Sequence, residues 1–256
     1  MKGSVARGRA VAAPLVLGLG AVVIWQLSVI LLQIKPFVLP SPVAIGTQFA
    51  NNLPTVWETS VVTGANAIVG LLIGGILGVS FATVAAVAPV VDELSVAVVA
   101  ALAVIPIVAL APVLYTMFGA GAETARQIVA GIAVFIPVYL NSLRGLRQVR
   151  AVHRDLMKVY AASPWQATRA ITLPTALPFV FTGLRVASSL AVISALVAEY
   201  FGGPVGGLGK AITSAASASN YALAWAYVLG SIVLGLVFYC VTLGLESLAS
   251  RHRPAA

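Results

Sequence analysis

The 256-residue sequence has few of the residues on which most enzyme chemistry depends. It has one cysteine, Cys240, which can form no disulfide within the chain and lies in an apolar run where a packed thiol is expected. The two histidines, His153 and His252, are far apart, and the seven acidic residues are scattered. This distribution argues against a metal site and against an acid–base pair. The sequence therefore predicts no catalytic centre, no metal site and no cofactor of its own.

The glycine-rich stretch from Gly203 to Lys210 does not fit a phosphate-binding loop. That motif needs a glycine separated by four residues from its closing Gly-Lys pair, then Ser or Thr, and it follows a strand. Pro204 and Ala211 occupy those two positions here. Any ATP-driven step is therefore expected to need another polypeptide.

Charged residues are also scarce, at 9% of the chain, whereas a soluble domain carries roughly a quarter. Hydrophobic residues make up 60%, and the mean hydropathy is +1.03. A helix needs about 20 predominantly apolar residues to cross a bilayer. Runs of about this kind predict six spans, namely Val11–Leu32, Val61–Val87, Leu94–Phe118, Ile128–Leu143, Phe179–Ala198 and Ala222–Leu245. The predicted fold class is an all-α, polytopic membrane protein with about six transmembrane helices.

These spans are expected to form one irregular domain, covering residues 1–256. Pro106 and Pro112 lie inside the third span, and proline kinks a helix unless neighbouring groups satisfy the carbonyl that it frees. The first apolar run is longer than the about 7–15 residues of a cleavable signal sequence, which favours a retained first helix. No linker, low-complexity tract or internal repeat divides the sequence.

The distribution of Lys and Arg predicts the orientation in the membrane. If both termini are cytosolic, eleven basic residues lie on the side where such residues collect, namely Lys2, Arg7, Arg9, Arg144, Arg147, Arg150, Arg154, Lys158, Arg169, Arg251 and Arg253. Lys35, Arg126 and Lys210 would then lie outside, and Arg185 within a span. Anionic lipid beside the cytosolic loops accounts for the net charge of +8 without nucleic acid as a partner.

One polar, basic segment, from Arg144 to Pro174, interrupts the apolar chain. At about 100° per residue its basic residues share one helical arc, namely Arg144, Arg147, Arg150, Arg154 and Lys158. The opposite arc holds Leu146, Val149, Val152, Leu156, Val159 and Tyr160. We therefore expect one amphipathic helix across the cytosolic mouth of the bundle. Spacing alone leaves open whether it docks on a soluble partner or lies in the headgroup layer.

The sequence from Asp155 to Pro174 resembles the EAA loop in permease subunits of bacterial ABC importers. The family pattern is Glu-Ala-Ala, three residues, Gly, about nine residues and Ile-x-Leu-Pro. Aligned on Leu173-Pro174, the corresponding positions are Asp155 for Glu, Leu156 and Met157 for the Ala pair, Ala161 for Gly and Ile171 for Ile. The acid is thus retained in kind, whereas the Ala pair and the Gly are lost.

Further segments resemble the nitrate, sulfonate and taurine branch of that family, in a shared order from Leu39 to Lys210. They are Leu39–Pro42, Ile105–Pro112, Phe118–Glu123, Phe135–Pro137 with Asn141, Leu177–Pro178, Thr182–Arg185, Ala198–Tyr200 and Gly207–Gly209. The resemblance implies a type I importer permease with a cytosolic coupling helix. Sulfonates, nitrate, thiamine-precursor pyrimidines and flavins are all substrates compatible with this branch.

The resemblance also implies partners in the bacterial inner membrane. The EAA loop would dock in a groove of a cytosolic subunit that binds ATP and Mg, with Tyr160 and Trp165 as anchors and Ser163-Pro164 as a turn. The full set of expected coupling residues is Asp155, Lys158, Tyr160, Ala161, Ser163, Pro164, Trp165, Arg169, Leu173 and Pro174. A second copy or a paralogous permease, an extracytoplasmic binding protein and membrane lipid are the other expected partners.

Polar side chains within the spans are candidates to line a translocation pathway, namely Asn66, Asn141, Arg185, Ser188 and Ser189. In hydrocarbon such groups also serve as interhelical hydrogen bonds. Arg185, about two turns from a helix start near Pro178, is expected to snorkel or to face a wet cavity. The external segment from Glu199 to Asn220 is rich in small residues and is expected to be either a gate or a loop.

An ion-coupled secondary transporter is the alternative function. It would favour an inverted repeat and a midplane acid, and the sequence indicates neither. An intramembrane enzyme would need clustered His, Asp or Ser residues, which the sequence does not offer. The permease subunit of an importer is therefore the preferred interpretation.

Overall fold

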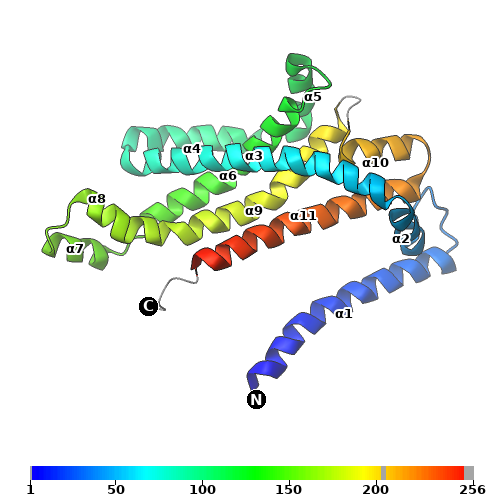
Figure 1. The fold of residues 1–256 in the computed structure, drawn as a ribbon, viewed down its shortest axis with the longest axis horizontal. Coiled ribbons are helices and arrows are strands. Elements are labelled where there is room, and N and C mark those ends of the chain that lie inside the picture. The colour runs from blue at the N-terminus through cyan, green and yellow to red at the C-terminus, as the bar shows by residue number, and fades with distance from the viewer. Residues whose placement is uncertain (1, 203–205, 251–256) are drawn as a thin grey trace.

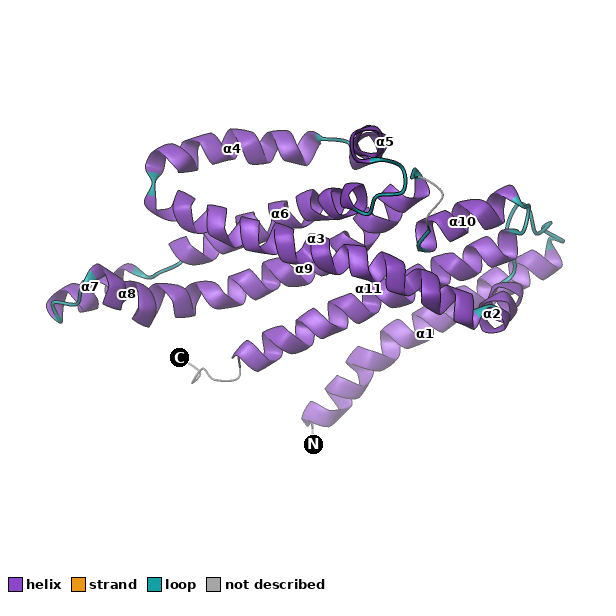
Figure 2. Cartoon of the chain, turned by 45° about the horizontal axis from the view of Figure 1, so that its top comes forward, coloured by secondary structure: helices purple, strands orange, loops and turns teal. Residues whose placement is uncertain are grey.

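The computed structural model describes residues 2–202 and 206–250, and their regular structure is entirely helical (Figures 1 and 2). The elements are α1 (Lys2–Leu31), α2 (Pro42–Asn51), α3 (Leu53–Val87), α4 (Pro89–Val104), α5 (Ile107–Phe118), α6 (Thr124–Arg147), α7 (Ala151–Val159), α8 (Pro164–Ala167), the π-helical turn η1 (Thr168–Thr172), α9 (Leu173–Tyr200), α10 (Leu208–Ser217) and α11 (Tyr221–Ser250). The predicted all-α class is confirmed. Part of the glycine-rich stretch, residues 203–205, and Arg251, His252 and Arg253 lie outside the described residues.

Five helices in the described chain are long and apolar enough to cross a membrane. They are Ala13–Leu31 of α1, all of α3, all of α6, Pro164–Tyr200 and Tyr221–Ala249 of α11. The third predicted span is instead broken, because α4 and α5 meet at an angle of 94°. Pro106, which has no N–H to continue a helix, caps the start of α5. Counted as one broken span, this pair brings the total to six, as predicted.

Small residues bring α3, α6 and α9 into close contact at the centre of the bundle. A Cβ on Gly74 of α3 would lie 2.3 Å from the carbonyl oxygen of Gly131 in α6. A Cβ on Gly145 of α6 would lie 2.6 Å from the Cβ of Phe179 in α9. In lipid, close van der Waals packing rather than escape from water drives helices together. The residues buried between these three helices are accordingly small: Ala67, Ala130, Val134, Val138, Ala187, Ala191, Val192 and Ala195.

Helix α1 diverges from the bundle toward the N-terminus (Figure 1). None of its membrane-crossing stretch is buried within the single chain. It contacts the bundle near its C-terminal end, where the rings of Trp25 and Trp225 meet edge to face at 5.7 Å between centroids. The Gln26 side chain there accepts a hydrogen bond from the N–H of Val43, at 3.1 Å. One long apolar helix is thus held at one end only.

The segment after α9 folds back onto the bundle as α10, and this defines one end of the molecule. Leu208 and Gly209, the first two residues of α10, are buried, and the helix packs against α3, α9 and α11. The segment from Glu199 to Asn220, predicted as a loop or a gate, is thus mostly helical. We call this the α10 end of the bundle and the opposite end, which carries α7 and α8, the projection end (Figure 1).

Candidate coupling site

Helices α7 and α8 extend beyond the ends of α6 and α9, and we call Ala151–Ala167 the projection (Figure 1). No residue of α7 is buried. Val152, Leu156 and Val159 are 68%, 50% and 82% exposed, and their spacing of four and three residues puts them on one face. This uncovered apolar stripe is the kind of surface that binds a partner or lies at a membrane surface.

The predicted amphipathic helix running unbroken from Arg144 to Lys158 is wrong. Helix α6 ends at Arg147, and Arg150 is extended, with φ −65° and ψ 140°, before α7 begins. The break separates the basic residues of α6 from those of α7, so they share no helical arc. The sequence has neither proline nor glycine between Arg147 and Ala151 to signal it.

Helix α7 ends in a Schellman turn around Ala161. The N–H of Ala161 bonds to the carbonyl of Lys158 at 2.9 Å, and the N–H of Ala162 bonds to the carbonyl of Met157 at 3.0 Å. This turn requires a left-handed residue, and Ala161 has φ 48°. The aligned family pattern has Gly at this position. The turn thus retains the backbone shape that favours Gly although the residue is Ala.

Helix α8 begins with a capping box at Ser163. The Ser163 hydroxyl accepts a hydrogen bond from the N–H of Gln166, and the Gln166 side chain accepts one from the N–H of Ser163, at 3.3 and 2.7 Å. Pro164 occupies the first helical position, where its missing N–H is not needed. These local signals set the bend between α7 and α8, and the next residue, Trp165, is 68% exposed.

Helix α8 continues through η1 into α9, so the projection is joined to a membrane span without a loop. Arg169 in η1 borders a cavity of about 540 Å³, together with Leu173 and Pro174 of α9. The end of the projection and α9 thus form one continuous helical segment, Pro164–Tyr200.

The ten residues predicted to couple to a partner are all exposed, and they extend along the chain from α7 to the start of α9. Asp155 and Lys158 form an exposed ion pair at 3.4 Å. Tyr160 is 73% exposed and lies in the turn before Trp165. The region thus combines an exposed apolar stripe, exposed aromatic side chains and charged residues.

Two contacts between α4 and α6 beside the projection were not predicted from the sequence. The Arg147 guanidinium, in the last turn of α6, lies 2.6 Å from the Asp92 carboxylate in the first turn of α4. The hydroxyls of Ser95 and Tyr139 form a buried hydrogen bond between the same helices. No sequence signal links residues so far apart in the chain.

The predicted pathway residues do not share one surface. Asn66 is buried and accepts a hydrogen bond from Gln127 of α6, at 3.2 Å. Asn141 donates to the carbonyl of Pro137 in its own helix, at 2.8 Å. Ser188 is buried and bonds to the carbonyl of Arg185, at 2.7 Å, and Ser189 is half-buried.

Arg185 has an acidic partner that the sequence analysis did not foresee. Its guanidinium lies 3.0 Å from the carboxylate of Glu246 in α11. Glu246 also accepts a hydrogen bond from Thr182, at 3.2 Å. The expected snorkelling is therefore replaced by an ion pair between α9 and α11.

Arg126, expected outside, lies in the first turn of α6 at the α10 end, where its side chain is fully buried. Its Nε donates to the Tyr115 hydroxyl at 3.1 Å, and its charge attracts the buried Glu199 carboxylate. Glu199 also accepts hydrogen bonds from the Thr63 hydroxyl and the Gly209 N–H, at 2.7 and 3.1 Å. Polar groups on α3, α5 and α10 thus form hydrogen bonds with these two buried side chains.

The fold and the projection define a polytopic membrane protein of the transporter type, with a surface suited to docking. Among the residues that the structure describes, no cluster of His, Cys, Asp or Glu fits a metal ion.

Comparison with known proteins assigns the family. Residues 70–250 match the family described as binding-protein-dependent transport system inner membrane component, and the chain belongs to it. It is 30% identical over 231 residues to the riboflavin transport system permease protein RibX of Chloroflexus aurantiacus, covering 90% of this chain and 85% of that one. It is 32% identical over 152 residues to the taurine transport system permease protein TauC of Escherichia coli, covering 59% and 53%.

The fold agrees with this assignment. A crystal structure of an amino acid ABC transporter matches with a TM-score of 0.59 at 14% identity, covering 78% of this chain and 94% of that one. The chain is therefore a permease subunit of a binding-protein-dependent ABC importer for a small solute, and such subunits are not catalytic. Nothing in these matches favours the secondary transporter.

Proposed function

We propose that the projection is the coupling element that docks in a groove of a cytosolic ATPase subunit. The observation that carries this proposal is the uncovered apolar stripe of α7, which ends at the exposed Tyr160 and is followed, across the Ala161 turn, by the exposed Trp165. Aromatic side chains seated in a partner's pocket dominate the binding energy of many interfaces. A helix lying in lipid headgroups would not need the capped turn that holds Trp165 at a fixed angle to α7.

The charged residues of the projection have a second role in this proposal. Asp155 and Lys158, which pair with each other in the single chain, and the exposed Arg169 flank the aromatic anchors in the sequence. We expect them to pair with charges at the rim of the ATPase groove, which fixes register more than affinity. Leu173 and Pro174 begin α9 and carry the movement onward. In the cycle we propose, ATP binding draws two ATPase subunits together and hydrolysis resets them.

The projection end faces the cytosol in this proposal, and both termini lie on that side. Arg144, Arg147, Arg150, Arg154 and Lys158 gather at this end, as expected for cytosolic segments. The α10 end then faces outward, where a substrate-loaded binding protein docks and releases its cargo.

A second permease completes the pathway. The uncovered α1 supports this, since it offers an apolar helix that the rest of its own chain does not cover. We propose that residues 1–256 form one transmembrane domain and that two copies, or this chain and a paralogue, pair within the lipid around a two-fold axis. Asn66, Asn141, Arg185, Ser188 and Ser189 remain the proposed polar groups of the pathway.

Replacing one exposed tryptophan tests the docking proposal. Trp165→Ala should reduce co-purification with the cognate ATPase subunit, with an affinity loss of about 30-fold if Trp165 is an anchor worth about 2 kcal/mol. Trp57→Ala is a matched control, because Trp57 is similarly exposed (71% against 68%) but lies at the α10 end.

Replacing a longer segment of the projection tests the same proposal. Replacing residues 155–165 with a Gly/Ser linker should leave membrane insertion intact and abolish the complex. Undiminished recovery of the ATPase with either variant would refute the assignment of the projection.

A further inference from the structure

The broken span α4–α5 is attached to the bundle by polar contacts at both of its ends. At the projection end, Asp92 of α4 pairs with Arg147 at 2.6 Å, and Ser95 bonds to Tyr139. At the α10 end, the Tyr115 hydroxyl of α5 accepts from Arg126 at 3.1 Å and donates to the carbonyl of Ala198 at 3.2 Å. This segment therefore touches both ends of the molecule.

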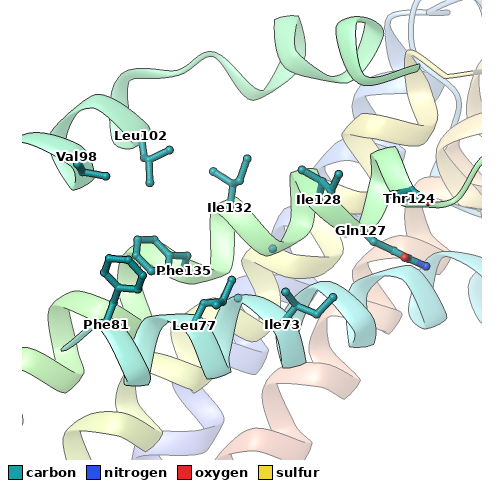
Figure 3. Close-up of a pocket in the computed structure, with 12 residues that line it drawn as sticks. Ile73, Leu77, Phe81, Val98, Leu102, Thr124, Gln127, Ile128, Ile132 and Phe135 are labelled. Atoms are coloured by element: carbon teal, nitrogen blue, oxygen red, sulfur yellow. The ribbon is translucent and has the colours of Figure 1, made fainter. Parts of the chain in front are cut away.

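Between these attachments α4 packs against α3 and α6 through the buried Val99, and a pocket lies beside this contact. Figure 3 shows Val98 and Leu102 of α4 facing Ile132 of α6 across a pocket of about 430 Å³. The walls of this pocket are almost entirely apolar and belong to α3, α4 and α6. The pocket leaves part of the inner face of α4 unpacked, whereas α3, α6 and α9 are packed closely against one another.

Arg147 is the last residue of the span that leads into the projection. Only Gln148, Val149 and Arg150 separate it from α7, and Arg150 is extended. Movement of α7 can therefore reach the last turn of α6 through a link of only three residues. From there the Arg147–Asp92 pair is the most direct connection to α4.

The charges of this pair suit the helices that carry them. Asp92 lies in the first turn of α4, where the helix dipole favours a negative charge, and Arg147 lies in the last turn of α6, where it favours a positive one. Because the ion pair is only half-buried, its contribution to the stability of the fold is modest. A modest contact between α4 and the last turn of α6 is suited to transmitting movement rather than to holding the fold.

We propose that Asp92 and Arg147 are positioning residues that carry the movement of the projection into α4–α5, and through it to the α10 end. This inference rests on the proposed docking of an ATPase on the projection. It adds a second route to the direct continuation of α8 into α9. Loss of the pair should uncouple ATP hydrolysis from transport without releasing the ATPase.

The test compares single, neighbouring and exchanged substitutions in proteoliposomes that contain the permease, the cognate ATPase subunit and the binding protein. Asp92→Asn and Arg147→Gln should each lower the solute transported per ATP hydrolysed by about five-fold, the lower end of typical coupling energies. Glu93→Gln, an exposed neighbour in the same turn, should leave this ratio unchanged.

The exchanged variant Asp92→Arg with Arg147→Asp should recover part of the ratio, because the pair is restored while both helix dipoles oppose it. Rescue of this kind would not arise if either residue served only to fold its own helix.

Retention of the ATPase on purification and the solute transported per ATP hydrolysed together separate failure of this inference from failure of the docking proposal. All of these variants should retain the ATPase on purification as well as the unaltered chain does. An unchanged transport ratio in both single variants, or a loss with no recovery in the exchanged variant, would overturn the transmission role alone. If the unaltered chain itself retains no ATPase, the docking proposal is overturned, and the transmission role with it.

Discussion

Replacing Ala161 with Gly should stabilise the turn that ends α7. Ala161 has φ 48°, a left-handed conformation that costs a residue with a Cβ about 1–2 kcal/mol. Glycine removes that cost, but its greater freedom in the unfolded chain lowers the stability by about 0.4–1 kcal/mol. The net gain in stability is about 0.5–1 kcal/mol. The population of the open turn should therefore fall by about 2–5-fold.

Hydrogen exchange is the assay, because the predicted gain is local and α7 is peripheral. The reporters are the amides of Ala161 and Ala162, which close the turn on the carbonyls of Lys158 and Met157. In Ala161→Gly both should exchange about 2–5-fold more slowly, after correction for the intrinsic rate of the new residue.

Ala162→Gly is the matched control, since Ala162 has a negative φ and glycine there brings only the entropic cost. Exchange should therefore be unchanged or faster in the control. Equal slowing in both variants, or no slowing in Ala161→Gly, would show that the left-handed turn is not a source of strain.

Two further predictions concern the stability of the bundle. Gly74→Ala should destabilise the detergent-solubilised protein by about 1–3 kcal/mol in thermal unfolding, because the new Cβ meets backbone of α6 at 2.3 Å. Gly235→Ala, with nothing within 4 Å, should instead be neutral or stabilising, and equal losses would contradict the packing argument. Glu199→Ala should cost about 1–3 kcal/mol, because it leaves the buried Thr63 hydroxyl and Gly209 N–H without the carboxylate that accepts their hydrogen bonds. The exposed Glu58→Ala should change stability by no more than about 0.5 kcal/mol, and a Glu199→Ala protein that melts like it would refute the role of the buried carboxylate.

Features set by nearby residues were predictable from the sequence. The apolar runs predicted the membrane-crossing helices because each span needs the same length of hydrocarbon-compatible sequence, whatever its neighbours. Ser163-Pro164 was predicted as a turn, and its capping box involves only residues within three positions. Pro106 was predicted to distort the third span, although the 94° bend is larger than a kink.

Features set by distant contacts were not predictable. The break after Arg147 lies in a sequence with ordinary helix-forming residues, and it coincides with an ion pair to Asp92 in another helix. Arg185 likewise finds Glu246 far along the chain. An isolated charge count treats each of these groups as unpaired, because the partner is fixed only when the helices pack.

Arg126 shows how such a contact changes an inference drawn from the sequence. The orientation was predicted by placing three basic residues outside, and Arg126 was one of them. Its side chain is fully buried beside Glu199, so it is a structural charge within the bundle rather than a loop charge that the translocation machinery would weigh. Without Arg126, only Lys35 and Lys210 remain of the three basic residues expected at the outer side, against eleven expected at the inner side. The buried pair that sequence reasoning missed thus strengthens the proposed orientation, in which the projection reaches the cytosol where an ATPase is found.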